Sequence, residues 1–346
     1  MQSTTIAVDL AKSVFQIAVS KSPGKVSESR RLTRKQFATF FARRKPALVL
    51  MEACGSSHFW ARTLRGYGHE VLLLPPSEVR RYVTRDKTDR TDAKALLEAH
   101  RNEEIRSVPV KSAAQQSTAS LHRLRSAWIG DRTARLNLIR GILREFGQVL
   151  PPGARQVVPQ ALSVLEDSSL EVSEPLRLAL REACAEVREL EQRIRGVEKH
   201  LEALAAESSV FCCLASVPGI GLLGGTALEA KVGDIRRFAT SRHFASFLGL
   251  PPKEHSSGLR RRLGAMSKRG DVYLRTLLIH GARAVLAAAK RKRHPDALSR
   301  WALAVETRRG HNVATVALAH KIARLAWAVW QRNTPYRAGG VAAGEV

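Results

Sequence analysis

The chain is poor in cysteine and in aromatic residues. Its 346 residues include only 4 cysteines and 5% aromatic residues, and no two cysteines form a CxxC pair. An HExxH motif is absent as well, so no pattern typical of a zinc site is present. We therefore expect buried, reduced thiols in a reducing compartment. The four residues concerned are Cys54, Cys184, Cys212 and Cys213.

Long hydrophobic runs are also missing. Hydrophobic residues make up 44% of the chain, but no uninterrupted apolar stretch reaches the ~18 residues that a membrane-spanning helix needs. The first residues lead directly into a strand-like segment, without the charged and apolar regions of a secretory signal. The sequence thus predicts a cytoplasmic protein with no membrane partner.

Acidic residues are scarce relative to basic ones. The chain has 31 Asp and Glu against 57 Lys and Arg, which gives a formal net charge of +26 and an isoelectric point near 11.0. Such an excess attracts polyanions. Nucleic acid is therefore the expected partner, and the basic surface suits RNA as readily as DNA.

Four of these few acidic residues stand out by their positions. Asp9 follows three apolar residues, and Glu52 ends the apolar run at residues 47–52. A carboxylate beside a core is costly unless it is paired or bound to a metal. Asp89 and Asp92 are three residues apart, a spacing that places both on one side of a helix. If that helix crosses the first and fourth strands, all four carboxylates converge.

A carboxylate cluster in a basic chain is typical of a divalent-metal site acting on a phosphodiester. Hard oxygen ligands hold Mg²⁺, with Mn²⁺ as an alternative, and two such ions can stabilise both the attacking and the leaving oxygen. Each residue also has a structural interpretation. An Asp at a strand end often forms a turn, and Asp89 and Asp92 can complement a helix dipole.

The pattern before residue 105 predicts an α/β domain. Residues 5–20 read as a β-hairpin, because two apolar runs flank a short Ala-Lys-Ser break. The remaining predicted elements are strands at residues 27–32, 47–52 and 70–74 and helices at residues 35–44 and 56–67.

The middle of the chain predicts two long helices. In the second of them, apolar residues from Val187 to Leu204 recur in alternating steps of three and four, which is the seam of a coiled coil. The seam is short, so an intramolecular helical hairpin and a dimer contact are both open. The chain after residue 210 predicts a compact, mostly helical region that ends in an apolar helix at residues 313–330.

A basic loop in this last region carries two serines. Ser256 and Ser257 precede Gly258, and five cations follow, which suits phosphate contacts; a merely solvated loop is the alternative. These cations are Arg260, Arg261, Arg262, Lys268 and Arg269. Upstream, a Gly-x-Gly-x-x-Gly run at residues 219–224 lacks a preceding strand, so a helix–helix turn fits better than a nucleotide fingerprint.

These blocks together resemble the DEDD insertion-sequence transposases, which include the Piv-type DNA invertases and the bridge-RNA-guided serine recombinases. Three acidic blocks carry Asp9, Glu52 and the Asp89–Asp92 pair. Four C-terminal blocks follow in order: Pro-Gly-Ile-Gly, Gly-Leu-Pro-Pro, Ser-Gly and Ser-Lys-Arg-Gly with a downstream Leu-Arg. The resemblance extends from residue 4 to about residue 332.

The resemblance implies a RuvC-like, RNase H-type N-terminal domain in which Asp9, Glu52, Asp89 and Asp92 bind the metal ions. It also implies a covalent serine nucleophile; Ser257 directly precedes Gly258, and Ser256 is the second candidate. Its further implications are donor and target DNA, a guide RNA encoded by the element, and a dimeric or tetrameric synapse. The resulting division is 1–105 (catalytic), 106–207 (helical, coiled-coil), 208–335 (mostly α, transposase) and 336–346 (tail).

The sequence thus predicts a transposase that cuts and rejoins DNA with a metal site and a serine. Two alternatives are open. A junction-resolving nuclease would use the same carboxylates with water as the nucleophile, and would not need the Ser-Gly block. A non-enzymatic nucleic-acid-binding protein would use the carboxylates structurally and would need no Mg²⁺.

Overall fold

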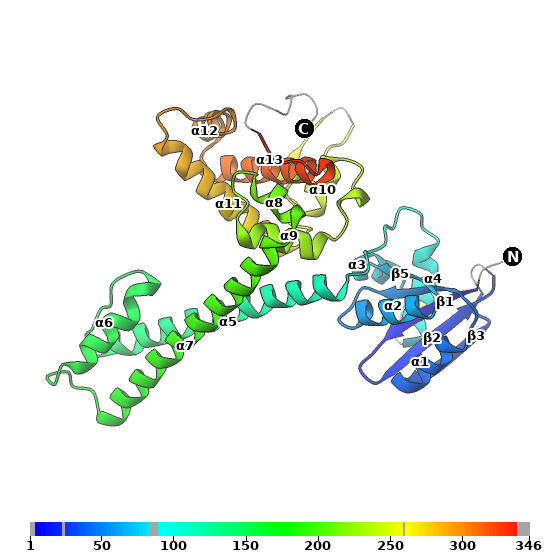
Figure 1. Ribbon diagram of the computed structural model, residues 1–346, viewed down its shortest axis with the longest axis horizontal. Helices are drawn as coiled ribbons and strands as arrows, with labels where there is room; N and C mark the ends of the chain where they lie inside the picture. Colours follow the sequence, from blue (N-terminus) through cyan, green and yellow to red (C-terminus); the bar gives the residue numbers. More distant parts are fainter. Residues whose placement is uncertain (1–3, 23–24, 84–88, 259, 338–346) are drawn as a thin grey trace. The chain divides into compact units, whose positions relative to one another are not determined.

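The computed structural model describes residues 4–22, 25–83, 89–258 and 260–337, with the side chains of residues 89 and 90 left out. Within this part the chain divides into two compact units, Met1–Ala114 and Gln115–Val346 (Figure 1). Of the tail predicted at residues 336–346, residues 338–346 lie outside the described residues, as do Lys87 and Thr88 of the third acidic block.

The first unit is built on a five-stranded mixed sheet in the order β3-β2-β1-β4-β5. The first three strands pair antiparallel, whereas β4 pairs parallel with both β1 and β5. The predicted hairpin and strands are all present. Their bounds are β1 (Thr5–Leu10), β2 (Val14–Ser20), β3 (Glu28–Thr33), β4 (Leu48–Glu52) and β5 (Glu70–Leu74).

Helices cover both faces of this sheet, because successive strand residues alternate between the faces. Ile6 and Val8 share a core with α1 and α2, while Ala7 lies in a second core with α4. The α1 helix starts at a capping box formed by Thr33 and Gln36. The helices of this unit are α1 (Arg34–Ala42), α2 (Ser57–Gly66), α3 (Pro76–Val79), the 3₁₀ turn η1 (Arg80–Tyr82) and α4 (Asp89–His100).

The second unit begins with an antiparallel helical hairpin. Its helices are α5 (Ala113–Glu145), α6 (Ala154–Glu166) and α7 (Glu174–Ala206), and their apolar sides form one core. Salt bridges from Arg125 to Glu198 and from Arg135 to Glu186 join α5 to α7 in opposite chain directions. The structure therefore pairs the two long helices within one chain. A coiled-coil supercoil remains a prediction.

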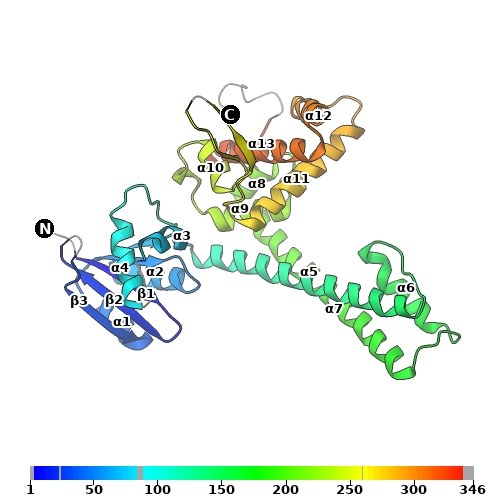
Figure 2. The same cartoon turned by 180° about the vertical axis from the view of Figure 1, so that it is seen from behind.

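The remainder of the second unit is a helical core, as the composition predicts. Its elements are α8 (Ser209–Ala215), α9 (Leu222–Val232), the 3₁₀ turn η2 (Ile235–Arg237), α10 (Ser241–Phe247), β6 (Pro252–Glu254), β7 (Leu263–Met266), α11 (Val272–Arg291), α12 (Ala297–Arg309) and α13 (His311–Arg332). The antiparallel β6–β7 hairpin, drawn in yellow in Figure 2, was not predicted, because its strands are short and exposed.

The Pro-Gly-Ile-Gly run forms the turn between α8 and α9, as a helix–helix turn predicts. Gly219 has φ +90°, and a Cβ on Gly281 of α11 would lie 1.9 Å from its carbonyl oxygen. The turn therefore uses glycine to pack its backbone against a neighbouring helix.

Among the described helices, α11 is the one that is long and apolar enough to cross a membrane. Leu274, Leu278 and Leu286 on this helix are buried in the core that also contains residues of α13. We therefore interpret α11 as a core helix.

The cysteines only partly follow the sequence prediction. Cys184 and Cys213 are buried free thiols, but Cys54 is half-buried and Cys212 is exposed. Cys212 lies on the short helix α8, directly before the buried Cys213, and neighbouring residues of a helix do not share a face.

Candidate functional site

The parallel pairing of β1 and β4 brings two of the four carboxylates next to each other. Val8 is paired with Met51, and the next residues along the two strands are Asp9 and Glu52. Paired residues on neighbouring strands point to the same face of a sheet, and every second residue returns to that face. Asp9 and Glu52 therefore lie on the face of Ala7, which is the face covered by α4. Both are partly exposed.

The start of α4 brings a third carboxylate to the same face. Glu52 and Asp92 line one cavity of about 570 Å³, together with Ser77 and Arg80. Ala93 and Leu96 of α4 are buried against the sheet, which fixes the side of the helix on which Asp92 lies. Arg80 is the basic residue among the described residues that line this cavity.

Asp89 is the first residue of α4, one turn before Asp92. Its side chain is outside the described part of the structure, so its approach to the other three carboxylates stays a prediction. Among the side chains that are described, no group of three or more His, Cys, Asp or Glu could hold a metal ion. The helix-dipole interpretation of Asp89 and Asp92 also remains open, since both lie in the first turn.

The chemistry of this site nevertheless fits a hard divalent cation. Glu52 and Asp92 present carboxylate oxygens to one cavity, and Mg²⁺ prefers carboxylate ligands while keeping several of its waters. A cavity of that volume has room for such waters.

The two candidate serines lie on the loop of the β6–β7 hairpin. The Ser257 amide donates to the carbonyl of Arg260, and the Arg260 amide donates back to Ser257, at 3.2 and 3.1 Å. Gly258 follows with φ +53°, a conformation that favours glycine in tight hairpin turns. The Ser-Gly pair thus forms the tip of a hairpin, and both serines are exposed.

The hydroxyl groups of the two serines have different surroundings. Ser256 Oγ donates to a carboxylate oxygen of Glu254 at 2.7 Å and accepts the backbone N–H of Arg262 at 3.1 Å. Within the described structure, the Ser257 hydroxyl makes no hydrogen bond. Ser256 therefore helps to hold the hairpin, whereas the Ser257 hydroxyl is free to meet a substrate.

The five cations predicted in one basic loop lie on two segments, because β7 separates them: Arg260, Arg261 and Arg262 precede β7, and Lys268 and Arg269 follow it. All five are exposed. Arg261 approaches Glu254 at 3.9 Å, with both side chains mostly exposed. An ion pair of this kind contributes little, so it does not prevent Arg261 from binding a phosphate.

Two glycines and one arginine hold the base of the hairpin. A Cβ on Gly270 would lie 2.3 Å from the carbonyl oxygen of Phe247, and one on Gly249 would lie 2.5 Å from the Gly270 amide. The buried Arg275 donates to the carbonyl oxygens of Leu248 and Gly270, at 3.4 and 3.1 Å. The Gly-Leu-Pro-Pro block and the Ser-Lys-Arg-Gly block, with its Leu-Arg, therefore pack as one structural unit below the serines.

Comparison with known proteins favours the transposase over the junction-resolving nuclease and the non-enzymatic binding protein. The profile of the transposase IS116/IS110/IS902 family matches residues 212–298, and a DEDD transposase profile matches residues 6–147. A protein named a probable family 20 transposase from Pseudomonas aeruginosa is 45% identical over 98% of this chain and 100% of its own length. The transposase for insertion sequence element IS1111A from Coxiella burnetii is 39% identical over 96% of this chain and 91% of its own length. The transposase for element IS1328 from Yersinia enterocolitica is 33% identical over 96% of this chain and 98% of its own length.

The chain belongs to the DEDD-type insertion-sequence transposases. The predicted family is confirmed, and so is the mixed α/β unit followed by a mostly helical region. The DEDD profile spans all four acidic positions. The IS116/IS110/IS902 family profile spans the serine hairpin with its basic residues.

Two features of this transposase were not predicted from the sequence. One local pattern in the sequence could have predicted the β6–β7 hairpin, namely the Ser-Ser-Gly turn at residues 256–258. Arg275 belongs to the Leu-Arg of the last C-terminal block, but its anchoring role was not predicted, because an Arg after Leu274 is ordinary at the start of a helix. Only the packing of α11 against the turn at Gly249 buries its guanidinium group.

Proposed function

We propose that this transposase cuts and rejoins DNA by two successive phosphodiester exchanges, with a carboxylate-bound metal site and a serine nucleophile. The observation that carries the proposal is the side-by-side register of Asp9 and Glu52 on the face where Asp92 shares a cavity with Glu52. This arrangement supports joint action of the carboxylates, which separate structural roles would not require.

We further propose that the first unit has a RuvC-like, RNase H-type fold. Three antiparallel strands followed by two parallel strands, with helices on both faces, support this assignment. The proposed division is a catalytic domain at residues 1–105, a helical segment at 106–207, a transposase domain at 208–335 and a tail at 336–346.

In the proposed reaction, Asp9, Glu52, Asp89 and Asp92 hold divalent cations. Mg²⁺ or Mn²⁺, when bound there, would supply Lewis-acid stabilisation of charge on the phosphate oxygens. Five exposed cations bind the backbone phosphates around the scissile bond and orient it. They are Arg260, Arg261, Arg262, Lys268 and Arg269.

Ser257 Oγ then attacks the phosphorus and loses its proton, and the bridging oxygen of the cut strand leaves as a hydroxyl after taking up a proton. The product is a phosphoserine ester between protein and DNA. A hydroxyl of the other DNA strand attacks this ester and releases Ser257. One ester replaces another at each step, so no external energy source is needed.

The DNA partners follow from this chemistry, and the number of copies is proposed from the family resemblance. The proposed enzyme acts on donor and target DNA, in the bacterial cytoplasm, within a synapse of two or four copies. An element-encoded guide RNA is proposed from the family resemblance, and the net charge of +26 is compatible with it.

Single-residue variants of the two serines test the proposal. With Mg²⁺ and element-end DNA, the wild type and Ser256→Ala should give a covalent protein–DNA band on a denaturing gel, and Ser257→Ala should give none. Because Ser257 is exposed, the Ser257→Ala variant should keep the fold, and circular dichroism checks this. Normal cleavage by Ser257→Ala, Ser256→Ala and the double variant would refute the serine mechanism in favour of a water-using nuclease.

A further inference from the structure

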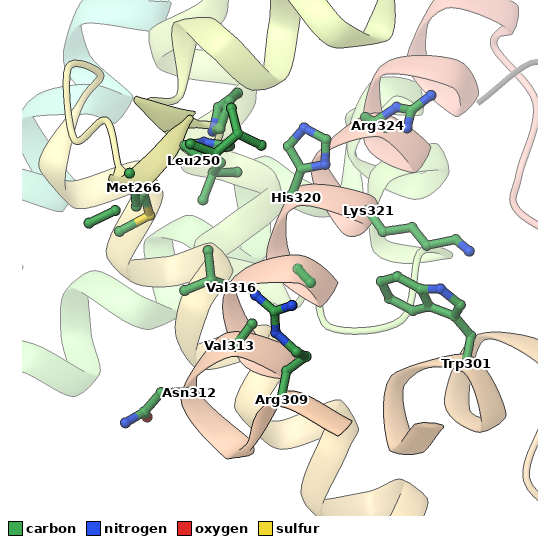
Figure 3. A pocket seen from close by; sticks show the side chains of 16 residues that line it. Leu250, Met266, Trp301, Arg309, Asn312, Val313, Val316, His320, Lys321 and Arg324 are labelled. Atoms are coloured by element: carbon green, nitrogen blue, oxygen red, sulfur yellow. The ribbon is translucent and has the colours of Figure 1, made fainter. Parts of the chain in front are cut away.

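A cavity of about 830 Å³ lies beside the serine hairpin, in the second unit. One wall is β7, including Met266, and the other comes from α13 and the end of α12 (Figure 3). Its floor is apolar, with Val313 and Val316 of α13 facing the hairpin. The volume is within the ~300–1,000 Å³ typical of small-molecule sites. We refer to this cavity as the α13 pocket.

The rim of the α13 pocket is cationic. Arg309, Lys321 and Arg324 line it, and its lining includes no Asp or Glu. In the described structure none of these three cations forms an ion pair with a carboxylate. Lys321 lies 4.3 Å from the ring centre of Trp301, and Arg324 Nε donates to Ser241 at 3.2 Å. The pocket therefore concentrates positive charge without compensating negative charge.

Burial and neighbouring cations both disfavour the positive charges at the rim. Burial, followed by the charge of Arg324, lowers the pKa of Lys321. Burial, followed by the charge of Arg242, lowers the pKa of Arg324 itself. A phosphate at this rim would relieve the repulsion between these cations.

We propose that the α13 pocket binds one unstacked nucleotide of the DNA strand whose phosphate Ser257 attacks. The base would lie against the apolar floor formed by Val313 and Val316, and the flanking phosphate would contact Arg309, Lys321 or Arg324. This inference rests on the proposed function and adds a strand-positioning site to it.

The place of the pocket supports this occupant. Met266 and Leu263 of β7 line the pocket, while the loop that joins β7 to β6 carries Ser257. One short hairpin would thus contact the base on one side and the scissile phosphate at its tip. A base inside a duplex presents only its edges and cannot lie against the apolar floor without leaving the stack, so the bound strand must be unpaired at this point.

The first experiment measures binding of two probes to the full-length protein without metal. The probes are a single-stranded dT oligonucleotide and an oligonucleotide of the same length made of abasic residues, which has the same phosphates but no bases. The wild type should bind the first probe about tenfold more tightly, because burial of the base surface against the apolar floor adds to the phosphate contacts.

Two matched pairs of variants locate this preference. Val313→Glu puts a negative charge on the exposed floor and should abolish the preference, whereas Val272→Glu changes an exposed valine outside the pocket and should keep it. Arg309→Ala should weaken binding of both probes about threefold or more, whereas Arg308→Ala removes a neighbouring charge outside the pocket lining and should weaken it less.

The second experiment is photo-crosslinking of an oligonucleotide that contains 5-iododeoxyuridine. Crosslinks should map to Met266 or Trp301, and Val313→Glu should remove them. The proposal is overturned if crosslinks map elsewhere, or if both members of each variant pair behave alike. It is also overturned if only RNA probes show the base preference. Because these assays need no cleavage, their failure would leave the serine and metal chemistry standing.

Discussion

The buried residue His122 should make the stability of the second unit fall in mild acid. Its ring is 1% exposed and lies between α5, α9 and α11. Thr226 Oγ1 donates to the carbonyl of Leu222 at 2.7 Å, so it can only accept from His122 Nε2 at 3.0 Å. In the neutral ring with its proton on Nε2, Nδ1 accepts the hydroxyl of Tyr273, also at 3.0 Å. Protonation of Nδ1 would remove this acceptor, so the hydrogen bond from Tyr273 favours the neutral ring.

The protonated ring is disfavoured for three reasons. Burial is the largest cause, followed by the charges of Lys231 and Arg125, and together they lower the pKa of His122 from 6.5 to about 4. The unfolded chain takes up a proton below pH 6.5, but the folded chain does so only near pH 4. The contribution of neutral His122 to the free energy of unfolding is thus complete above pH 6.5. It is lost as the pH falls toward 4, where the loss reaches about 3 kcal/mol. At pH 5 the expected loss is about 2 kcal/mol.

Urea unfolding followed by far-ultraviolet circular dichroism measures this effect at pH 7, 6 and 5. The comparison is between the wild type and His122→Gln, whose amide can still donate and accept but does not titrate. Other titrating groups cancel in the difference between the two proteins. The stability of the wild type should decrease by about 2 kcal/mol more than that of the variant between pH 7 and pH 5. Parallel loss in both proteins would refute the assignment of a neutral, buried His122.

Three further predictions concern the core, the metal site and the basic loop. Gly281→Ala should destabilise the second unit by about 1–3 kcal/mol, because its Cβ would meet the Gly219 carbonyl at 1.9 Å. Gly130→Ala is the control, since a Cβ there would have nothing within 4 Å. Equal thermal unfolding midpoints for the two variants would contradict the packing argument. Asp92→Asn should abolish Mg²⁺-dependent cleavage while leaving DNA binding within about threefold in a filter-binding assay; retained cleavage would exclude Asp92 as a metal ligand. Neutralising Arg260, Arg261, Arg262, Lys268 and Arg269 together should flatten the plot of log affinity against log salt by about 0.7–0.9 per lost phosphate contact, and an unchanged slope would mean that the loop is only solvated.

The sequence by itself determined the family and most of the local structure. Two apolar, partly β-branched runs predicted β1 and β2, and the short Ala-Lys-Ser break between them predicted their hairpin. The first of these runs marked Asp9 as unusual, and the apolar run at residues 47–52 marked Glu52, since a carboxylate next to buried strand residues needs a partner. These signals are readable because they lie within a few residues of each other along the chain.

Only the tertiary structure decided which distant residues meet. The parallel register of β1 with β4 puts Asp9 beside Glu52, and the packing of α4 brings Asp92 to the cavity that Glu52 lines. Strand order and helix placement depend on the burial of whole faces, which no local pattern encodes. The same holds for the α13 pocket, whose walls are separated by dozens of residues, and for His122, whose pKa depends on helices far along the chain. The chemistry of each residue is thus set by its type, and its role is set by the neighbours that folding provides.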